Sequence, residues 1–154
     1  MARILVVEDE TSQRYVMADL LLRSGHEARS TPDPREAIAV AEEFGPDVLV
    51  SDWLLKSDLT GRDVAQALRA RDPNLPVVFI TALPAQIVEA QASELRPFKV
   101  VNKPCEFYDL LLAIHEALGN VVEARSCGPL RRRAPPGAGT PPPCYTDQSC
   151  SKTR

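Results

Sequence analysis

The chain has 154 residues, of which 44% are hydrophobic, and its formal net charge is −3 at pH 7. This length and composition favour one globular domain with a single core. No apolar run approaches the roughly 18 residues of a membrane span, and the start MARILVVEDE is unlike a secretory signal, so we expect a cytoplasmic protein without membrane contact. The cysteines lack CxxC spacing and neighbouring histidines, which argues against a zinc site or a disulfide framework.

Charge is distributed unevenly along the chain. Acidic residues outnumber basic ones over residues 1–122, whereas basic residues prevail over residues 123–154. An acidic globular part argues against binding to a nucleic-acid backbone, and the arginine run 131–133 is explained more simply as a solvated segment. We therefore expect no direct DNA binding.

Apolar runs and segments with helical spacing alternate along the chain. We predict strands at 4–7, 26–31, 47–51, 76–80 and 99–101, and helices at 15–25, 33–46, 60–73, 83–95 and 105–119. Such alternation is typical of βαβ units around a parallel sheet. Because the run 26–31 is only weakly apolar, we expect it at an edge of the sheet.

Two helices have explicit start signals. Asp33 is expected to cap the second helix, with Pro34 at the first helical position and Glu36 reaching back to complete a capping box. Thr60 and Asp63 predict a capping box at the start of the third helix.

The composition changes after Gly119, where we predict that the last helix ends. The remaining residues are rich in proline and arginine and contain little apolar material. Such a segment buries too little surface to offset the entropy lost on ordering. We therefore predict a domain over residues 1–120 and a disordered Pro/Arg-rich tail over residues 121–154.

Polar side chains stand where four of the predicted strands end. In chain order they are Glu8 and Asp9, Asp52, Thr81 and Lys103, after the first, third, fourth and fifth strands. Taken singly, each is also explained as a helix cap or a solvated side chain. Because the carboxyl ends of parallel strands line the ligand crevice of an open sheet, we expect these side chains to lie together.

These side chains point to a particular chemistry. Converging carboxylates repel one another unless a cation shares the site, and an all-oxygen set favours a hard ion such as Mg²⁺. Lys103 supplies a positive charge and Thr81 a hydroxyl donor, which a newly formed anion needs. The arrangement suits phosphoryl transfer, in which a carboxylate can become an aspartyl phosphate.

On these residues the chain resembles the receiver domain of bacterial two-component response regulators, of the single-domain type. The resemblance covers about residues 3–118 and rests on the motifs ILVVEDE, VSDWLL, ITA and NKP. It implies a flavodoxin-like, doubly wound α/β fold. In that fold five parallel strands lie in the order 2-1-3-4-5, and helices cover both faces of the sheet. We expect five helices in this chain.

The resemblance also implies roles. Asp52 accepts a phosphoryl group from a sensor histidine kinase or a histidine phosphotransfer protein, and Thr81 and Lys103 bind the phosphoryl oxygens. The domain is then not an enzyme beyond its own phosphorylation and dephosphorylation. The implied Mg²⁺ ligands are Asp9, Asp52, Glu8 through a water molecule, and the backbone carbonyl of Leu54.

The sequence departs from the family pattern at two places. The loop after Asp52 lacks the usual proline and reaches its glycine, Gly61, one residue later than usual. Val100 stands where receivers usually carry tyrosine or phenylalanine, so the usual movement of an aromatic ring is in question. Phe98 falls on the same face of the strand and is a conjectural substitute.

Other functions share parts of this pattern. A Mg²⁺-dependent aspartyl phosphatase of the haloacid dehalogenase type would carry a second aspartate where Leu54 stands, and a flavodoxin-like electron carrier would carry a Thr- and Gly-rich loop after the first strand. Val100 leaves open a degenerate receiver that acts as a constitutive binding module or phosphate sink. Since the sequence shows no second domain, we expect output by contact with an effector protein, through the fourth helix, fifth strand and fifth helix.

Overall fold

The structure is a computed structural model, and it describes residues 1–96 and 98–126. One parallel sheet has the strand order β2-β1-β3-β4-β5. Its strands are β1 (Arg3–Val7), β2 (Glu27–Thr31), β3 (Val48–Asp52), β4 (Val77–Thr81) and β5 (Lys99–Asn102). The strand order confirms the order 2-1-3-4-5, and β2 lies at an edge, as its weakly apolar sequence predicts.

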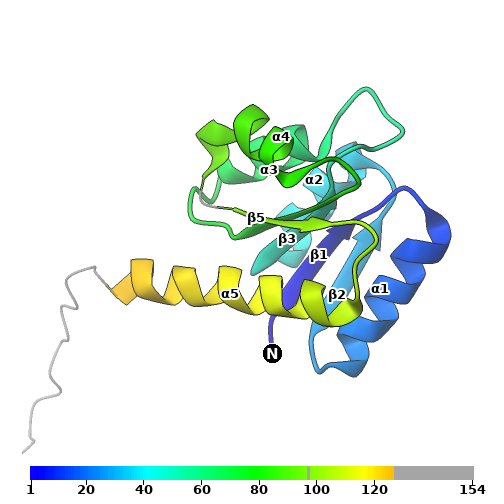
Figure 1. Cartoon of the computed structure of the whole chain (residues 1–154). Coiled ribbons are helices and arrows are strands. Elements are labelled where there is room, and N and C mark those ends of the chain that lie inside the picture. The colour runs from blue at the N-terminus through cyan, green and yellow to red at the C-terminus, as the bar shows by residue number, and fades with distance from the viewer. Residues whose placement is uncertain (97, 127–154) are drawn as a thin grey trace, which may run out of the picture.

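Helices connect successive strands and cover both faces of the sheet. They are α1 (Thr11–Arg23), α2 (Pro34–Phe44), α3 (Gly61–Arg69), α4 (Ala85–Gln91) and α5 (Phe107–Ser126), with a short 3₁₀ helix η1 (Ser93–Leu95) after α4. In Figure 1, α1 and α5 lie on one side of the sheet and α2, α3 and α4 on the other. The predicted doubly wound α/β fold is therefore confirmed.

The central strands β3 and β4 are buried along their entire length because both of their faces are covered. Alternate side chains then enter two separate apolar clusters. Leu49 and Phe79 belong to the cluster beneath α2, α3 and α4, whereas Val48 and Val50 belong to the cluster beneath α1 and α5. This rigid centre fixes the positions at which β3 and β4 end.

The start signals of α2 and α3 have different outcomes. The capping box of Thr60 and Asp63 is present at α3, as predicted. At α2, Asp33 caps the helix through the backbone N–H of Arg35, but the predicted box is wrong. The Glu36 carboxylate accepts a hydrogen bond from the Thr31 hydroxyl instead, and the same hydroxyl oxygen accepts the backbone N–H of Asp33.

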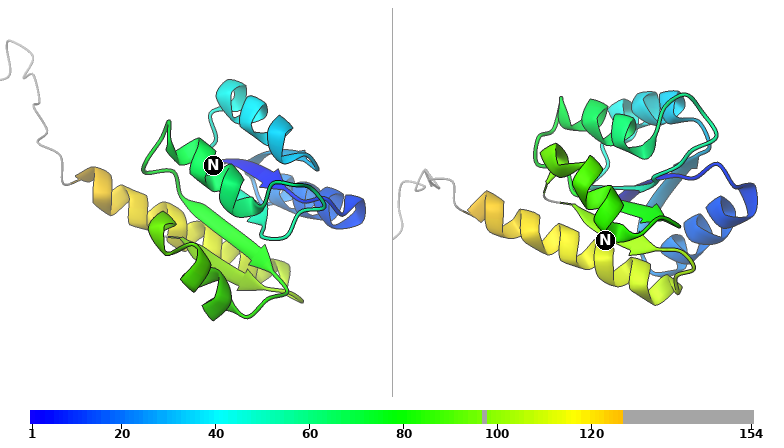
Figure 2. Two further views of the ribbon diagram at one scale, coloured as in Figure 1. Left: turned by 90° about the horizontal axis from the view of Figure 1, so that it is seen from above. Right: turned by 45° about the horizontal axis from the view of Figure 1, so that its top comes forward.

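The predicted end of the last helix at Gly119 is wrong, because α5 continues to Ser126. A glycine inside a helix costs only about 1 kcal/mol relative to alanine, and the next helix breakers in the sequence are Gly128 and Pro129. Figure 2 shows the C-terminal part of α5 projecting beyond the sheet. Residues 121–126 are thus helical, and the rest of the predicted tail lies outside the described residues.

The first helix also differs from its prediction, since α1 begins at Thr11 rather than at residue 15. Nothing in the intervening TSQR interrupts a helix, and the backbone N–H of Arg14 already donates to the carbonyl of Glu10.

Within the described part of the chain, no helix combines the length and the apolarity that a membrane span requires.

Candidate functional site

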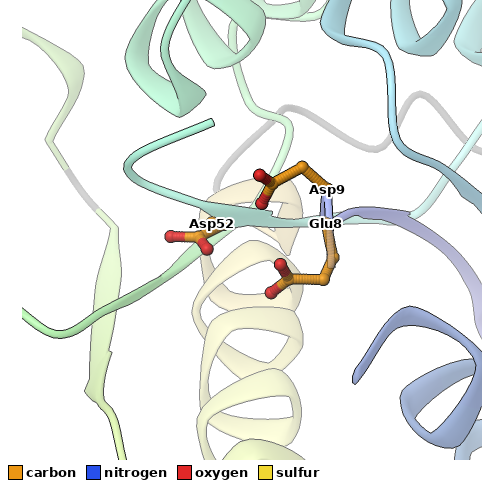
Figure 3. A group of neighbouring side chains, drawn as sticks. All are labelled: Glu8, Asp9 and Asp52. Carbon is orange, nitrogen blue, oxygen red and sulfur yellow. The ribbon is translucent and has the colours of Figure 1, made fainter. Parts of the chain in front are cut away.

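Three carboxylates converge at the carboxyl edge of the sheet. Strands β1 and β3 are neighbours, with Val7 opposite Ser51, so the residues that follow Val7 arrive beside Asp52. One oxygen atom from each of Glu8, Asp9 and Asp52 lies within 4.8 Å of the others. Figure 3 shows Glu8 and Asp9 turning their carboxyl groups toward the side on which Asp52 lies. The structure thus brings together the three acidic residues that the sequence singles out.

Lys103 supplies positive charge to this cluster. Its Nζ lies 2.8 Å from Oδ2 of Asp52 and 3.0 Å from Oε2 of Glu8. The side chain comes from the end of β5, two strands away from Asp52, and follows Asn102, which pairs with Thr81 on the intervening strand. The cation therefore bridges the two more deeply buried carboxylates of the cluster.

The electrostatic balance of the cluster is visible in two pKa shifts. Burial raises the pKa of Glu8, which is only 1% exposed, and hydrogen bonds from the Glu10 backbone and from Lys103 offset part of that rise. Burial alone would lower the pKa of Lys103, but its hydrogen bonds to Asp52 and Glu8 outweigh that effect and raise it. Three carboxylates still outnumber the ammonium groups of Lys103 and of Lys56, whose Nζ lies near Asp9, and the net negative charge that remains favours a further cation.

The loop between β3 and α3 closes over the site. The backbone N–H of Leu54 donates to Oδ1 of Asp52 at 3.2 Å, and the backbone N–H of Lys56 donates to Oδ2 of Asp9 at 3.3 Å. The Leu54 side chain itself is 55% exposed. Since both bonds come from backbone groups, the path of this loop fixes the orientation of two carboxylates.

Gly61 anchors the far end of the same loop. Its N–H donates to the carbonyl of Trp53 at 3.1 Å, and a Cβ atom at this position would lie 2.2 Å from the backbone oxygen of Asp52. Although the glycine comes one residue later than in the family pattern, it still packs against Asp52. The extra residue is therefore accommodated in the loop that precedes it.

Thr81 is the last residue of β4 and is 1% exposed. Its Oγ1 accepts a hydrogen bond of 3.0 Å from the backbone N–H of Leu83, in the loop that leads to α4. In the sheet it pairs with Asn102, and Lys103 comes next in the chain. Thr81 thus reaches the predicted edge, with its hydroxyl oxygen engaged by the β4–α4 loop.

Val100 and Phe98 both pack against the cluster beneath α2, α3 and α4, which agrees with the alternation predicted from the sequence. The Phe98 ring meets the Phe79 ring edge to face at 5.3 Å between centroids, and Phe79 meets Trp53 in the same way at 5.1 Å. These three rings form a chain of contacts from the residue before β5 to the residue after Asp52.

Sequence reasoning missed two residues that shape the site. Arg14 is buried in α1, and its Nη1 donates to the backbone carbonyl of Glu8 at 2.9 Å. Lys56 places its Nζ 3.7 Å from Oδ2 of Asp9. A charged residue on the inner face of an amphipathic helix is a signal that identifies Arg14, whereas nothing in the pattern around Lys56 indicates its contact.

The donor set fits a hard divalent cation. It consists of carboxylate oxygens at the carboxyl ends of two adjacent strands, without histidine or cysteine, and these are the ligands that Mg²⁺ prefers. The backbone carbonyl of Leu54 remains a predicted ligand.

Comparison with known proteins finds relatives that are named as sensory transduction and response regulator proteins. The chain is 35% identical over 118 residues to the sensory transduction protein RegX3 of Mycolicibacterium smegmatis, an alignment that covers 77% of this chain and 51% of that protein. It therefore spans about half the length of this curated relative. It is also 31% identical to the response regulator protein FleR of Pseudomonas aeruginosa, with 84% of this chain and 27% of that protein covered.

Solved structures agree on the fold. A receiver domain protein from Clostridium thermocellum superposes with a TM-score of 0.73 at 24% identity and covers 80% of this chain and 99% of its own, a likeness that shows the fold alone. Residues 4–115 match the family described as the response regulator receiver domain. Because that match spans most of the chain, the protein belongs to the family of response regulator receiver domains of two-component systems.

Proposed function

We propose that Asp52 is the phosphoacceptor of this receiver domain and takes its phosphoryl group from a phosphohistidine of a kinase or phosphotransfer protein. The observation that carries the proposal is the double restraint on its carboxylate, with Lys103 on Oδ2 and the Leu54 N–H on Oδ1. Asp52 is 8% exposed and lies at the carboxyl end of β3, whereas Glu8 is almost completely buried. The Asp52 carboxylate is thus held in place and reachable by a donor.

The proposed step conserves atoms and electrons. An oxygen of the Asp52 carboxylate attacks the phosphorus, a P–O bond forms, and the P–N bond to the donor histidine breaks. The electron pair of that bond stays on the imidazole nitrogen. Lys103 then binds a phosphoryl oxygen in place of the free carboxylate. Thr81 donates its hydroxyl hydrogen to a second phosphoryl oxygen, while its own oxygen still accepts the Leu83 N–H.

We further propose that Glu8, Asp9, Asp52 and the carbonyl of Leu54 hold Mg²⁺, directly or through water. When bound, the ion would neutralise the repulsion between the carboxylates and the charge of the phosphoryl group. The supporting observation is the convergence of three carboxylates, which the ammonium groups of Lys103 and the exposed Lys56 leave undercompensated.

A groove of about 680 Å³ beside Lys103 supports a protein as the donor. It lies between α1 and α5, and its apolar lining includes Val16, Met17, Leu20, Phe107 and Leu110. A partner that packs an apolar helix into this groove would bring a histidine close to Asp52. We propose contact with a protein effector as the output of the phosphorylated domain.

The proposal is tested by intact-mass measurement after incubation with acetyl phosphate or phosphoramidate and Mg²⁺. We expect one added phosphoryl group on the wild type and none on Asp52→Asn. Asp19→Asn, which removes a carboxylate from the exposed surface of α1, is the matched control and should be phosphorylated like the wild type. An equal adduct on Asp52→Asn, or none on the wild type with either donor, would overturn the proposal.

A further inference from the structure

Asn102 connects the end of β5 to the loop that follows β4. Its side-chain Nδ2 donates to the backbone carbonyl of Leu83 at 2.5 Å and lies 3.5 Å from the carbonyl of Thr81. The N–H of Leu83 donates in turn to the hydroxyl oxygen of Thr81 at 3.0 Å. Leu83 is therefore held from both sides, by Asn102 through its carbonyl and by Thr81 through its N–H.

This arrangement restricts the Thr81 hydroxyl. A threonine hydroxyl has one hydrogen to donate and two lone pairs to accept with. Because the Leu83 N–H occupies a lone pair, the hydroxyl hydrogen must point to an acceptor elsewhere. If Leu83 moved, the Thr81 oxygen would lose this bond, which helps to fix the direction of its hydroxyl hydrogen.

We propose that Asn102 is a positioning residue for Thr81. By fixing Leu83 it holds the Thr81 hydroxyl for donation to a phosphoryl group on Asp52, and it links occupancy of Asp52 to the start of α4 two residues after Leu83. This inference rests on the proposed function, because it assigns Asn102 a part in the same site.

The chemistry of the neighbouring positions supports this assignment. Val100 lies two residues earlier on β5, and its partly buried side chain packs against the apolar cluster beneath α2, α3 and α4. It carries no polar group that could bond to the loop between β4 and α4. The Asn102 side chain carries an amide donor and already contacts the loop. It is also exposed, so removing it opens no cavity in the core.

The first test reads the Asn102 contact in the unphosphorylated protein. Asn102→Asp keeps the shape of the side chain but replaces the amide donor with an oxygen facing the Leu83 carbonyl. We expect hydrogen exchange of the Leu83 N–H to accelerate about tenfold or more in Asn102→Asp and in Asn102→Ala. Asn74→Ala, a change in the exposed loop before β4, is the control. Unchanged exchange at Leu83 in both Asn102 variants would overturn the proposal.

The second test reads the consequence at the site by NMR, with Mg²⁺ and beryllofluoride as the phosphoryl mimic. In the wild type we expect amide shifts near Asp52 and along α4. In Asn102→Asp the shifts along α4 should fall severalfold while those near Asp52 persist. Equal α4 shifts in both proteins would overturn the positioning role alone, whereas no shifts near Asp52 in the wild type would overturn the proposed function and this inference with it.

Discussion

The ammonium group of Lys103 lies 2.8 Å from Oδ2 of Asp52 and already pairs with the proposed phosphoacceptor in the unmodified protein. Its second contact, 3.0 Å from Oε2 of Glu8, keeps the ammonium over the carboxylate cluster. In the proposed function the same group has two tasks, to limit carboxylate repulsion before phosphorylation and to bind a phosphoryl oxygen afterwards.

Replacing Lys103 with methionine separates these tasks. We expect Mg²⁺ to bind more tightly to Lys103→Met, because the competing ammonium is gone, and phosphorylation by acetyl phosphate to slow about a hundredfold. Calorimetric titration with Mg²⁺ and timed intact-mass measurement read the two effects. Lys99→Met, which removes an ion pair with Glu116 away from the site, should change neither. Weaker Mg²⁺ binding in Lys103→Met would contradict this account of the cluster.

Among the carboxylates of the proposed metal site, Asp9 is the one with which Lys103 forms no ion pair. We expect Asp9→Asn to lower the affinity for Mg²⁺ at least tenfold while the free energy of unfolding without Mg²⁺ stays the same or rises by up to about 1 kcal/mol, since a repelling charge is removed. Trp53 fluorescence during Mg²⁺ titration is a convenient measure, because its buried indole follows Asp52 in the chain. Unaltered Mg²⁺ affinity in Asp9→Asn would exclude Asp9 as a ligand.

Replacing Gly61, at the start of α3, and Gly119, within α5, with alanine should change the free energy of unfolding in opposite directions. A Cβ on Gly61 would lie 2.2 Å from the Asp52 carbonyl oxygen, whereas a Cβ on Gly119 meets nothing within 4 Å. We expect Gly61→Ala to lower the free energy of unfolding by about 1–3 kcal/mol and Gly119→Ala to raise it by about 0.5–1 kcal/mol. Urea denaturation of the two variants checks both signs, and a neutral Gly61→Ala would show that the loop is not anchored at Asp52.

His26, at the opposite end of the sheet, makes stability depend on pH. Burial, the nearby His115 and the N-terminal ammonium lower its pKa from the ordinary value of 6.5. Its Nδ1 also accepts the backbone N–H of Ala2 at 3.2 Å, a bond that the protonated ring cannot make. The unfolded chain therefore takes up the proton first, so this contribution to stability is complete above about pH 7.5 and is lost as the pH falls through 6.5 toward the lowered pKa.

The difference in unfolding free energy between the wild type and His26→Gln isolates this effect from the titration of the carboxylates. We expect the wild type to lose more stability than His26→Gln between about pH 7.5 and 5. Parallel pH profiles for the two proteins would mean that His26 titrates alike in the folded and unfolded chain.

Much of the fold could be predicted because its signals are local. The β-branched runs at 47–51 and 76–80 predict strands that are buried on both faces, and β3 and β4 are. The capping box of Thr60 and Asp63 needs only two residues at the correct spacing. The strand order, by contrast, came from the resemblance to a family, since periodicity alone does not say which strands pair.

Several features that escaped prediction depend on side-chain contacts that spacing along the sequence does not reveal. Glu36 does not close its box because Thr31, at the end of a strand, offers a competing hydroxyl. Asn102 reaches Leu83, which is 19 residues away, and Lys103 reaches Glu8, which is 95 residues away. Because the carboxyl ends of parallel strands line one crevice, the sequence predicts that Glu8 and Lys103 lie at the same end of the sheet. It does not predict that they form an ion pair.

The most direct measurement is to locate the phosphoryl group by reductive trapping. Borohydride reduces an acyl phosphate to an alcohol, so a phosphorylated aspartate is read as homoserine in a sequenced peptide. After treatment with acetyl phosphate and Mg²⁺, we predict homoserine at position 52 and unmodified Glu8 and Asp9. Reduction at Glu8 or Asp9 in place of Asp52, or no reduced residue in a sample that carries the added phosphoryl mass, would contradict the assignment of Asp52 as the phosphoacceptor.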